Sequence, residues 1–346
     1  MVTSVHPRAR LVFDGRIYTP AAWCADRPGP AAVCNALDRW SDADVPTMTL
    51  HTSGSTGRPK PVVHRKDHMA ASARATIDFF GLGPESTALL ALPADKVGGL
   101  MMLVRALVGG WTLHVAKPSN TPFSTVAEPI DFTALVPSQA RASLDREPTA
   151  WHQVRTVILG GGMVDAGLER RLATLDTAVW QTFGMTETIS HVALRRIGAD
   201  VAYTALDGVR FATTQDGRLV IHAPHLGCDR LETNDLVDLE DEHTMRWLGR
   251  ADNAIESGGI KHVPEVLEAR IAELMNDRAY YITGRPHDVL GRELTLVIEG
   301  TPFDTRSLVE AMTERLEAYA VPRAIIFRPE LERTPNGKLR RTDLGA

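Results

Sequence analysis

The order of apolar and polar residues predicts alternating strands and helices through most of the chain. Residues 66–80 repeat apolar positions at helical spacing, whereas residues 154–159 form a short apolar run that is typical of a buried strand. Helices are likewise predicted at 99–108, 138–144 and 165–174, and strands at 45–50, 87–92, 111–116, 134–136 and 178–180. This alternation favours an α/β fold in which helices flank a layered sheet.

The C-terminal part of the chain has a different pattern. A helix is predicted to begin at Pro264, and its apolar stripe is Val263, Leu267, Ile271 and Leu274. Strands are predicted at 280–283, 294–299 and 324–327, a helix at 304–319, and a hairpin at 210–221. We therefore expect a large N-terminal domain over residues 1–251 and a small, mobile α+β domain over residues 252–346. Residues 1–44 carry weak signals, with one possible strand at 10–13.

Composition and charge argue against several classes of protein. The chain has 346 residues, 44% hydrophobic and 23% charged, which is ordinary globular usage with length for about two domains. A net charge of -5 without a basic run argues against a nucleic-acid partner. Because neither a signal-peptide pattern nor a stretch of about 18 apolar residues occurs, we expect a cytoplasmic protein without a membrane span. The scattered, odd set of Cys24, Cys34 and Cys228 is typical of reduced thiols.

A loop rich in hydroxyl groups and glycines follows the strand predicted at 45–50. Its backbone N–H groups, its hydroxyls and one lysine can converge on phosphate oxygens, and the glycines allow close backbone approach. The candidate residues are Thr52, Ser53, Gly54, Ser55, Thr56, Gly57 and Lys60. The spacing is not that of a P-loop, because Gly54 and Gly57 are three apart and Pro61 follows the lysine. Taken alone, such a cluster is more often a plain turn.

A second candidate site follows the strand predicted at 178–180. The ring of Phe183 can stack on a base, the hydroxyl of Thr186 can donate to a phosphate, and the carboxylate of Glu187 can hold Mg²⁺, which prefers oxygen ligands. Gly184 and Met185 lie between them. The ends of strands carry function in α/β sheets. The alternative is an ordinary strand-to-helix loop with Thr186 as its N-cap.

Later loops add isolated charges. Asp235, next to apolar residues, can accept both hydroxyls of a ribose, although Asn-Asp pairs are also common in turns. Glycine-rich bends at 248–252 and 257–261 flank a predicted hinge. Lysine occurs only at positions 60, 66, 96, 117, 261 and 338. Lys338 lies on a Pro-Asn-Gly turn that projects its side chain, as an unremarkable surface loop would also do.

In their order and spacing, these loops resemble those of the acyl-adenylate-forming superfamily of acyl-CoA synthetases, adenylation domains and luciferases. The resemblance covers residues 45–341 and implies ATP, Mg²⁺ and coenzyme A as ligands. It implies catalytic roles for Lys338, Thr186 and Lys60. The implied nucleotide and CoA contacts are residues 52–57, Lys60, Gly161, Phe183, Gly184, Met185, Thr186, Asp235, Arg250, Ser257, Gly258, Gly259 and Lys261, with Glu187 as the metal ligand and Asp252 as the hinge.

The chain departs from that superfamily at several positions. The segment before the phosphate loop is shorter than in most members. Pro61 replaces a usual glycine and removes a backbone donor. Asn234 stands for the middle glycine of a Thr-Gly-Asp signature, a mild change because asparagine tolerates left-handed backbone angles. Lys96 stands where many members have histidine or an aromatic residue, which leaves the gate of the acyl pocket open to question.

Within the superfamily, residues 92–93, 97–101, 135–139 and 257–261 look most like those of the 2-succinylbenzoate:CoA ligases of menaquinone biosynthesis. The candidate substrate contacts are Arg105, Ser138 and Gly161. Arg105 is the one charge in an apolar helix, and a buried arginine needs an anionic partner. That partner is either the remote carboxylate of the substrate or an internal Asp or Glu.

The implied mechanism has two halves, adenylation of the acid and transfer to the thiol of CoA, with a swing of the small domain about Asp252 between them. Three alternatives stay open: another aryl or acyl acid, the thiol of a carrier protein as acceptor, and a catalytically silent homologue that only binds nucleotide or acyl groups. A homodimer is also possible.

Overall fold

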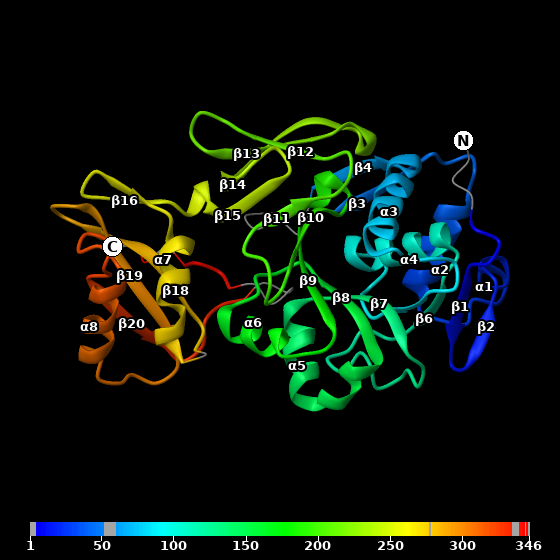
Figure 1. Cartoon of the computed structure of the whole chain (residues 1–346), viewed down its shortest axis with the longest axis horizontal. Coiled ribbons are helices and arrows are strands. Elements are labelled where there is room, and N and C mark those ends of the chain that lie inside the picture. The colour runs from blue at the N-terminus through cyan, green and yellow to red at the C-terminus, as the bar shows by residue number, and fades with distance from the viewer. Residues whose placement is uncertain (1–4, 52–59, 277, 334–338, 343, 345–346) are drawn as a thin grey trace. The chain divides into compact units, whose positions relative to one another are not determined.

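The computed structural model describes residues 5–51, 60–276, 278–333, 339–342 and 344. The chain divides into two compact units (Figure 1). The first comprises Met1–Met163, Arg171–Arg210 and Ile221–Leu231, and the second comprises Val164–Arg170, Phe211–Val220 and Glu232–Ala346. The domain boundary expected between residues 251 and 252 stays a prediction.

The first unit is built on a mixed sheet. Its strands are β1 (Arg10–Phe13), β2 (Arg16–Tyr18), β5 (Thr87–Leu90), β6 (Thr112–Val115), β7 (Ile130–Leu135), β8 (Val154–Leu159), β9 (Ala178–Gly184), β10 (His191–Arg196) and β11 (Tyr203–Ala205). They lie in the order β11-β10-β9-β8-β7-β5-β6-β1-β2. The pairs from β9 through β6 to β1 are parallel, and those to β2, β10 and β11 are antiparallel. In β8 only Arg155 is exposed, as expected for a central parallel strand covered on both faces.

Helices accompany these strands in the predicted alternation. They are α1 (Pro20–Asp26), α2 (Ala31–Ser41), α3 (Lys66–Phe80), α4 (Val97–Gly109), α5 (Pro137–Arg146) and α6 (Ala166–Ala173), with 3₁₀ turns η1 (Pro148–Gln153), η2 (Thr186–Thr188) and η3 (Pro224–Leu226). α4 packs against α3 (Figure 1). It is buried from Gly99 to Leu107. A Cβ on Gly99 would lie 2.2 Å from the carbonyl oxygen of Pro93, so glycine lets the first turn of α4 approach the preceding loop.

A separate hairpin of β3 (Thr47–His51) and β4 (Pro61–Arg65) flanks residues 52–59. Further along the chain, β12 (Arg210–Thr213), β13 (Arg218–Ala223), β14 (Cys228–Leu239) and β15 (Thr244–Arg250) are neighbours in that order. The predicted hairpin at 210–221 is confirmed, because Thr214 N–H donates to the Arg218 carbonyl at 2.9 Å.

The C-terminal part combines a small sheet with helices. It contains η4 (Ala251–Asn253), β16 (Ile255–Ser257), β17 (Ile260–His262), α7 (Pro264–Ile271), η5 (Ala272–Met275), β18 (Tyr280–His287), β19 (Gly291–Glu299), α8 (Arg306–Arg315) and β20 (Ala324–Arg328). β19 is central, antiparallel to β18 and parallel to β20. The predicted succession of helix, two strands, helix and strand is confirmed.

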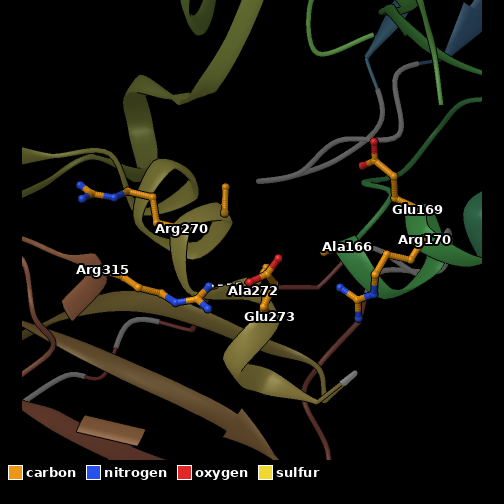
Figure 2. Close-up of a pocket in the computed structure, with 8 residues that line it drawn as sticks. Ala166, Glu169, Arg170, Arg270, Ala272, Glu273 and Arg315 are labelled. Carbon is orange, nitrogen blue, oxygen red and sulfur yellow. Dashed lines mark hydrogen bonds and ion pairs between the residues drawn. The ribbon is translucent and has the colours of Figure 1, made fainter. Parts of the chain in front are cut away.

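A surface cavity of about 360 Å³ is lined by residues of the second unit, which come from the first part of α6 (residues 166–170) and from α7, η5 and α8 (Figure 2). Charged side chains make up much of its wall, where Arg315 pairs with Glu273 at 2.8 Å. None of the residues predicted to bind ATP, the acid or CoA lines it. We therefore assign it no part in the chemistry.

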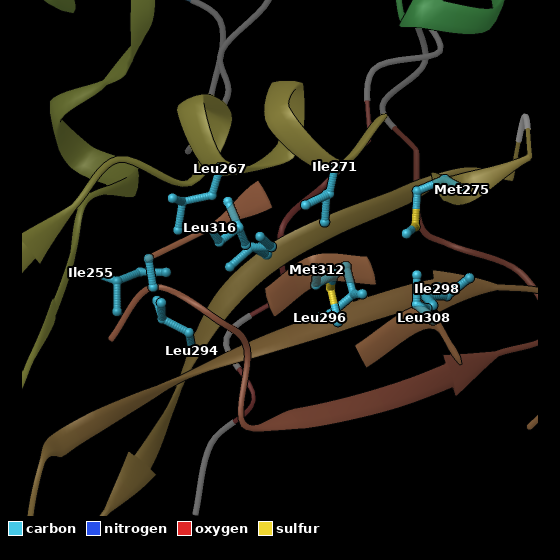
Figure 3. Close-up of a cluster of buried hydrophobic side chains, with 12 residues drawn as sticks. Ile255, Leu267, Ile271, Met275, Leu294, Leu296, Ile298, Leu308, Met312 and Leu316 are labelled. Atoms are coloured by element: carbon cyan, nitrogen blue, oxygen red, sulfur yellow. The ribbon is translucent and has the colours of Figure 1, made fainter. Parts of the chain in front are cut away.

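The core of the C-terminal elements is apolar and continuous (Figure 3). Leu267 and Ile271 of α7 cluster with Leu296 of β19 and Met312 of α8, all 6% exposed or less. The apolar stripe predicted for the helix at Pro264 is confirmed at Leu267 and Ile271, which this core buries. Every fully buried member of the cluster lies between Ile255 and Ala320.

The α/β fold class and the possible strand at 10–13, which is β1, are confirmed, and two local predictions are wrong. Residues 1–44 also contain α1 and α2, for which the sequence carried no clear signal. β9 runs to Gly184 rather than ending at Trp180, because Gln181 and Thr182 pair with β10. The helix expected at 304–319 is the shorter α8. Among the described residues, no helix has both the length and the apolarity needed to cross a bilayer.

Candidate active site

The carboxyl ends of β7, β8 and β9 bring three predicted segments to one edge of the sheet. The strands are parallel neighbours, and α/β sheets bind ligands at this edge. A Cβ on Gly161 would lie 3.4 Å from the side chain of Val136, and one on Gly162 would lie 3.3 Å from Pro137. The loop that contains Gly161 is therefore in contact with the start of α5, where Ser138 lies exposed.

The buried Gln139 fixes the start of α5. Its amide nitrogen donates to the carbonyls of Ala91 at 3.0 Å and Ser119 at 2.9 Å, and its oxygen accepts the N–H of Val136 at 3.2 Å. These bonds tie the loops after β5 and β6 to the loop after β7. Sequence reasoning gave Gln139 no role, although glutamine at the third position of a helix is a known capping signal.

The segment expected to bind adenine is a narrow loop between paired strands. Gly184 pairs with His191 as β9 turns back into β10. A Cβ at position 184 would lie 2.2 Å from the Ser190 carbonyl oxygen, so only glycine fits this crossing. The alternative of a strand-to-helix loop with Thr186 as N-cap is wrong, because η2 is followed by β10 and its N-cap residue is Met185. Phe183 is half-buried, edge-on to Tyr203 at 5.9 Å.

His64 on β4 supports this loop. Its Nε2 lies 2.7 Å from the carbonyl oxygen of Thr186, and because a carbonyl only accepts, this nitrogen carries the hydrogen. Burial lowers the pKa of His64, opposed only in part by the bond to Thr186 and the charge of Glu187. The imidazole is therefore neutral at pH 7. No motif in the sequence marks His64, since its partner lies 122 residues away.

Glu187 presents an exposed carboxylate on the same loop. The described residues contain no group of three or more His, Cys, Asp or Glu side chains that could hold a metal by themselves. Mg²⁺ does not require one, because it keeps several waters and binds through one or two carboxylates together with substrate phosphates. A single accessible carboxylate beside a predicted phosphate site fits that ion.

Arg105 is buried among neutral partners. It is 1% exposed and donates from Nε to Thr76 Oγ1 at 3.1 Å, and from Nη2 to Ser190 Oγ at 2.9 Å and His191 Nδ1 at 3.4 Å. Burial lowers the pKa of Arg105 to about 9. Burial and the charge of Arg105 lower the pKa of His191 well below 6.5. The alternative of an internal Asp or Glu partner is therefore wrong for the described residues, and contact with a substrate carboxylate stays a prediction.

In the second unit, the predicted ribose contact Asp235 faces Arg250, which the resemblance also implies as a nucleotide contact. Asp235 and Arg250 are paired across β14 and β15. Trp247 Nε1 donates to Asp235 Oδ1 at 2.9 Å, and Arg250 Nη1 lies 3.8 Å from Oδ2. Arg250 also binds both oxygens of Asp252, at 2.9 and 2.8 Å. Arg250 thus links the candidate ribose contact Asp235 to the candidate hinge residue Asp252 through ion pairs.

The residues between 257 and 261 that are predicted to contact CoA lie in the β16–β17 hairpin. Ser257 pairs with Ile260, and the two turn residues Gly258 and Gly259 have φ of +58° and +80°. A two-residue turn with positive φ at both positions favours glycine. Gly258 N–H donates to the Leu290 carbonyl at 3.0 Å, and Lys261 is exposed on β17.

Part of the predicted site lies outside the described residues: Thr52, Ser53, Gly54, Ser55, Thr56, Gly57 and Lys338. Lys60 is described, and it is exposed at the residue that precedes β4. The predicted roles of these residues therefore stay predictions.

A model of a known family, the AMP-binding enzyme family, matches residues 6–215, which is more than half of the chain. The chain belongs to the AMP-binding enzyme family. Among the relatives of this AMP-binding enzyme, a protein of Mycobacterium tuberculosis named "Probable 2-succinylbenzoate--CoA ligase" is 30% identical over 334 residues, covering 88% of this chain and 84% of the relative. A Listeria monocytogenes protein named "2-succinylbenzoate--CoA ligase" is 26% identical, covering 89% of this chain and 71% of the relative.

Solved structures of AMP-binding enzymes share the fold. A crystal structure from Dyadobacter fermentans, described as an acyl-CoA synthetase (AMP-forming)/AMP-acid ligase II-like protein, is 32% identical with a TM-score of 0.64, covering 94% of this chain and 97% of that one. The O-succinylbenzoate coenzyme A synthetase of Bacillus subtilis, solved with ATP and magnesium, has a TM-score of 0.74 at 22% identity, covering 85% of this chain and 68% of that one. At that identity the likeness concerns the fold alone.

Proposed function

We propose that this AMP-binding enzyme is an AMP-forming acid–CoA ligase whose acid is 2-succinylbenzoate, in menaquinone biosynthesis. The proposal depends on the meeting of the Ser138, Gly161 and Thr186 segments at the carboxyl edge of β7, β8 and β9. The choice of acid is supported by the names of the relatives from Mycobacterium tuberculosis and Listeria monocytogenes.

In the first half-reaction, a carboxylate oxygen of the acid attacks the α-phosphorus of ATP, and the bond to pyrophosphate breaks. Lys60 and Lys338 neutralise the charge that develops on the phosphate oxygens, and Thr186 donates to them. Glu187 would hold the Mg²⁺, which when bound neutralises further phosphate charge. Asp235 and Arg250 bind the ribose.

In the second half-reaction, the thiol of CoA gives its proton to water, and its sulfur attacks the carbonyl carbon of the acyl-adenylate. AMP leaves, and the thioester remains. The resemblance to the superfamily implies that the small domain rotates about Asp252 between the two half-reactions. This rotation withdraws Lys338 and presents the Ser257–Gly259 hairpin turn, so that one site serves both half-reactions.

The experiment that tests this proposal is an ATP-dependent ligation assay with CoA, in which 2-succinylbenzoate, benzoate and medium-chain fatty acids compete, with products identified by mass spectrometry. We expect 2-succinylbenzoate to give the highest kcat/KM. A Glu187→Gln enzyme should lose adenylate formation, whereas Glu310→Gln, which changes an exposed carboxylate of α8, should not.

Other outcomes assign a different role. A tenfold preference for benzoate or a fatty acid, about 1.4 kcal/mol in transition-state terms, would overturn the choice of acid. Adenylate that transfers to a carrier-protein thiol and not to CoA would overturn the acceptor. No adenylate with any acid would identify a binding homologue.

A further inference from the structure

The loop that carries Thr186 and Glu187 ends in a strained turn. Ile189 is fully buried and has φ +67° and ψ −55°, and the N–H of Ser190 donates to the carbonyl of Thr188 at 2.7 Å. This is a γ-turn of the rare positive-φ form, and a β-branched residue at its centre is a conformational outlier. Such strain persists only where surrounding contacts over-determine it, and it collects at functional sites.

Hydrogen bonds hold the loop at several points. At its start, the Thr188 hydroxyl accepts the N–H of Met185 at 3.0 Å. In its middle, His64 donates to the Thr186 carbonyl. At its end, the Ser190 hydroxyl accepts from Arg105 at 2.9 Å. The bond from Arg105 is charge-assisted and therefore the strongest type among them.

The group that holds the end of the loop is itself fixed. Thr76 Oγ1 on α3 accepts from Arg105 Nε and lies 3.2 Å from His191 Nε2. Because Nδ1 of His191 faces the guanidinium, this neutral ring accepts there and carries its hydrogen on Nε2, which donates to Thr76. α3, the end of the loop and β10 thus converge on the guanidinium that α4 carries.

We propose that Arg105 is a positioning residue: by binding the Ser190 hydroxyl it holds the strained turn at Ile189, and so fixes where Thr186 and Glu187 meet the nucleotide and its metal. This role rests on the proposed function, since the metal role of Glu187 belongs to it. It differs from direct binding of a substrate carboxylate, because the guanidinium acts through the loop.

Two variants and a matched control test the role. Arg105→Met removes the donor, and Ser190→Ala removes only the acceptor and leaves the buried charge in place. The control is Thr177→Val, which deletes a buried hydrogen bond of 2.8 Å to the Trp151 carbonyl at the opposite end of β9. Amide hydrogen exchange of residues 185–191 reports the loop without any ligand, and calorimetry of ATP binding at graded Mg²⁺ reports the metal site.

We expect both variants to speed exchange in this segment and to raise the Mg²⁺ concentration for half-maximal ATP binding by on the order of tenfold, the usual effect of losing an outer-shell partner of a metal ligand. Thr177→Val should change neither. Because a purely structural role would lower thermal stability without altering the Mg²⁺ requirement of the folded protein, that requirement separates the two explanations.

The proposal fails if Arg105→Met raises only the KM of a dicarboxylate acid while exchange and Mg²⁺ dependence match the wild type, since Arg105 would then be a direct substrate contact. If Arg105→Met does not fold, Ser190→Ala decides, and wild-type exchange and Mg²⁺ dependence in that variant overturn the proposal. If the wild type does not bind ATP, the proposed function fails, and the exchange of residues 185–191 still tests the positioning of the loop.

Discussion

Two arginines, the buried Arg105 of the first unit and the half-buried Arg341 of the second, are stabilised in opposite ways. Arg105 has neutral partners, and its pKa is lowered to about 9 by burial. Burial also disfavours the charge of Arg341, but Glu268 and Glu265 more than offset this, so its pKa is raised. Arg341 Nη2 lies 2.8 Å from Glu268 and 3.3 Å from Glu265, and Nη1 donates to the Ile282 carbonyl at 2.9 Å.

The difference shows what each arginine contributes. The pairing of Arg341 with two acids joins the last described residues of the chain to α7, and Arg341 follows the candidate catalytic Lys338 by three positions. Loss of Arg341 would leave the buried carboxylates of Glu265 and Glu268 without a cationic partner. Loss of Arg105 would leave the hydroxyls of Thr76 and Ser190 and the imidazole of His191 without a hydrogen-bond donor. Arg105 therefore matters for the positions of the groups around it and not for the balance of charge.

The largest effect is expected from Arg341→Met. This substitution leaves the buried Glu265 and Glu268 without their cationic partner. It should therefore reduce the free energy of unfolding by about 3–5 kcal/mol. Urea denaturation of the full chain measures this. The control is Arg270→Met, which breaks an exposed pair with Glu317 and should cost no more than about 1 kcal/mol. Equal losses in the two variants would contradict the contribution assigned to the buried pairing.

A smaller loss is expected from Arg105→Met. Its partners are neutral, so the unsatisfied groups it leaves behind should cost about 1–3 kcal/mol in urea denaturation. Replacing Arg105 also removes a charge that is costly to bury, which keeps the net loss at the low end. If Arg105→Met reduced the free energy of unfolding as much as Arg341→Met, an anionic partner would have to balance Arg105. The two arginines would then be stabilised in the same way.

The smallest effect concerns pH. The pKa of His191 lies below 6.5 in the folded protein, because of burial and then the charge of Arg105. As pH falls below 6.5, His191 binds a proton in the unfolded chain but stays neutral in the folded protein. The free energy of unfolding therefore decreases, by at most about 1.4 kcal/mol per pH unit for one group. His191→Gln should flatten this decline in pH-dependent denaturation, whereas exposed His152→Gln should not. An unchanged slope in His191→Gln would contradict the lowered pKa of His191 in the folded protein.

The fold could be predicted wherever the apolar pattern was strong. The strand at 154–159 and the helix at 66–80 were predicted with the bounds that the structure has, because each is an uninterrupted run of one periodicity. α2 was missed, since its buried face includes small residues such as Cys34 and Ala36 that carry little hydrophobic signal. β9 was predicted too short, because its polar end is determined by pairing with β10, which no local pattern encodes.

The candidate site could be predicted only as separate loops. The sequence marked Arg105 as an unusual charge, but its partners come from positions 76, 190 and 191, which are distant along the chain. Ile189 carries no signal of a positive φ, because its conformation is imposed by the contacts around it. Glycine and hydroxyl composition predicts where a ligand can approach, whereas the supports beneath such a loop require the folded structure.

Gly184 has a consequence for how mutational data on this chain should be interpreted. Its missing side chain makes room for the Ser190 carbonyl, so a saturation library would score position 184 as essential through loss of folded protein, with no ligand involved. Gly161, whose added Cβ would meet Val136 at an ordinary contact distance, would tolerate asparagine far better despite its φ of +74°. Abundance measured beside activity therefore distinguishes a glycine that the backbone requires from one that a nucleotide requires, even though both lie in loops that resemble nucleotide-binding motifs.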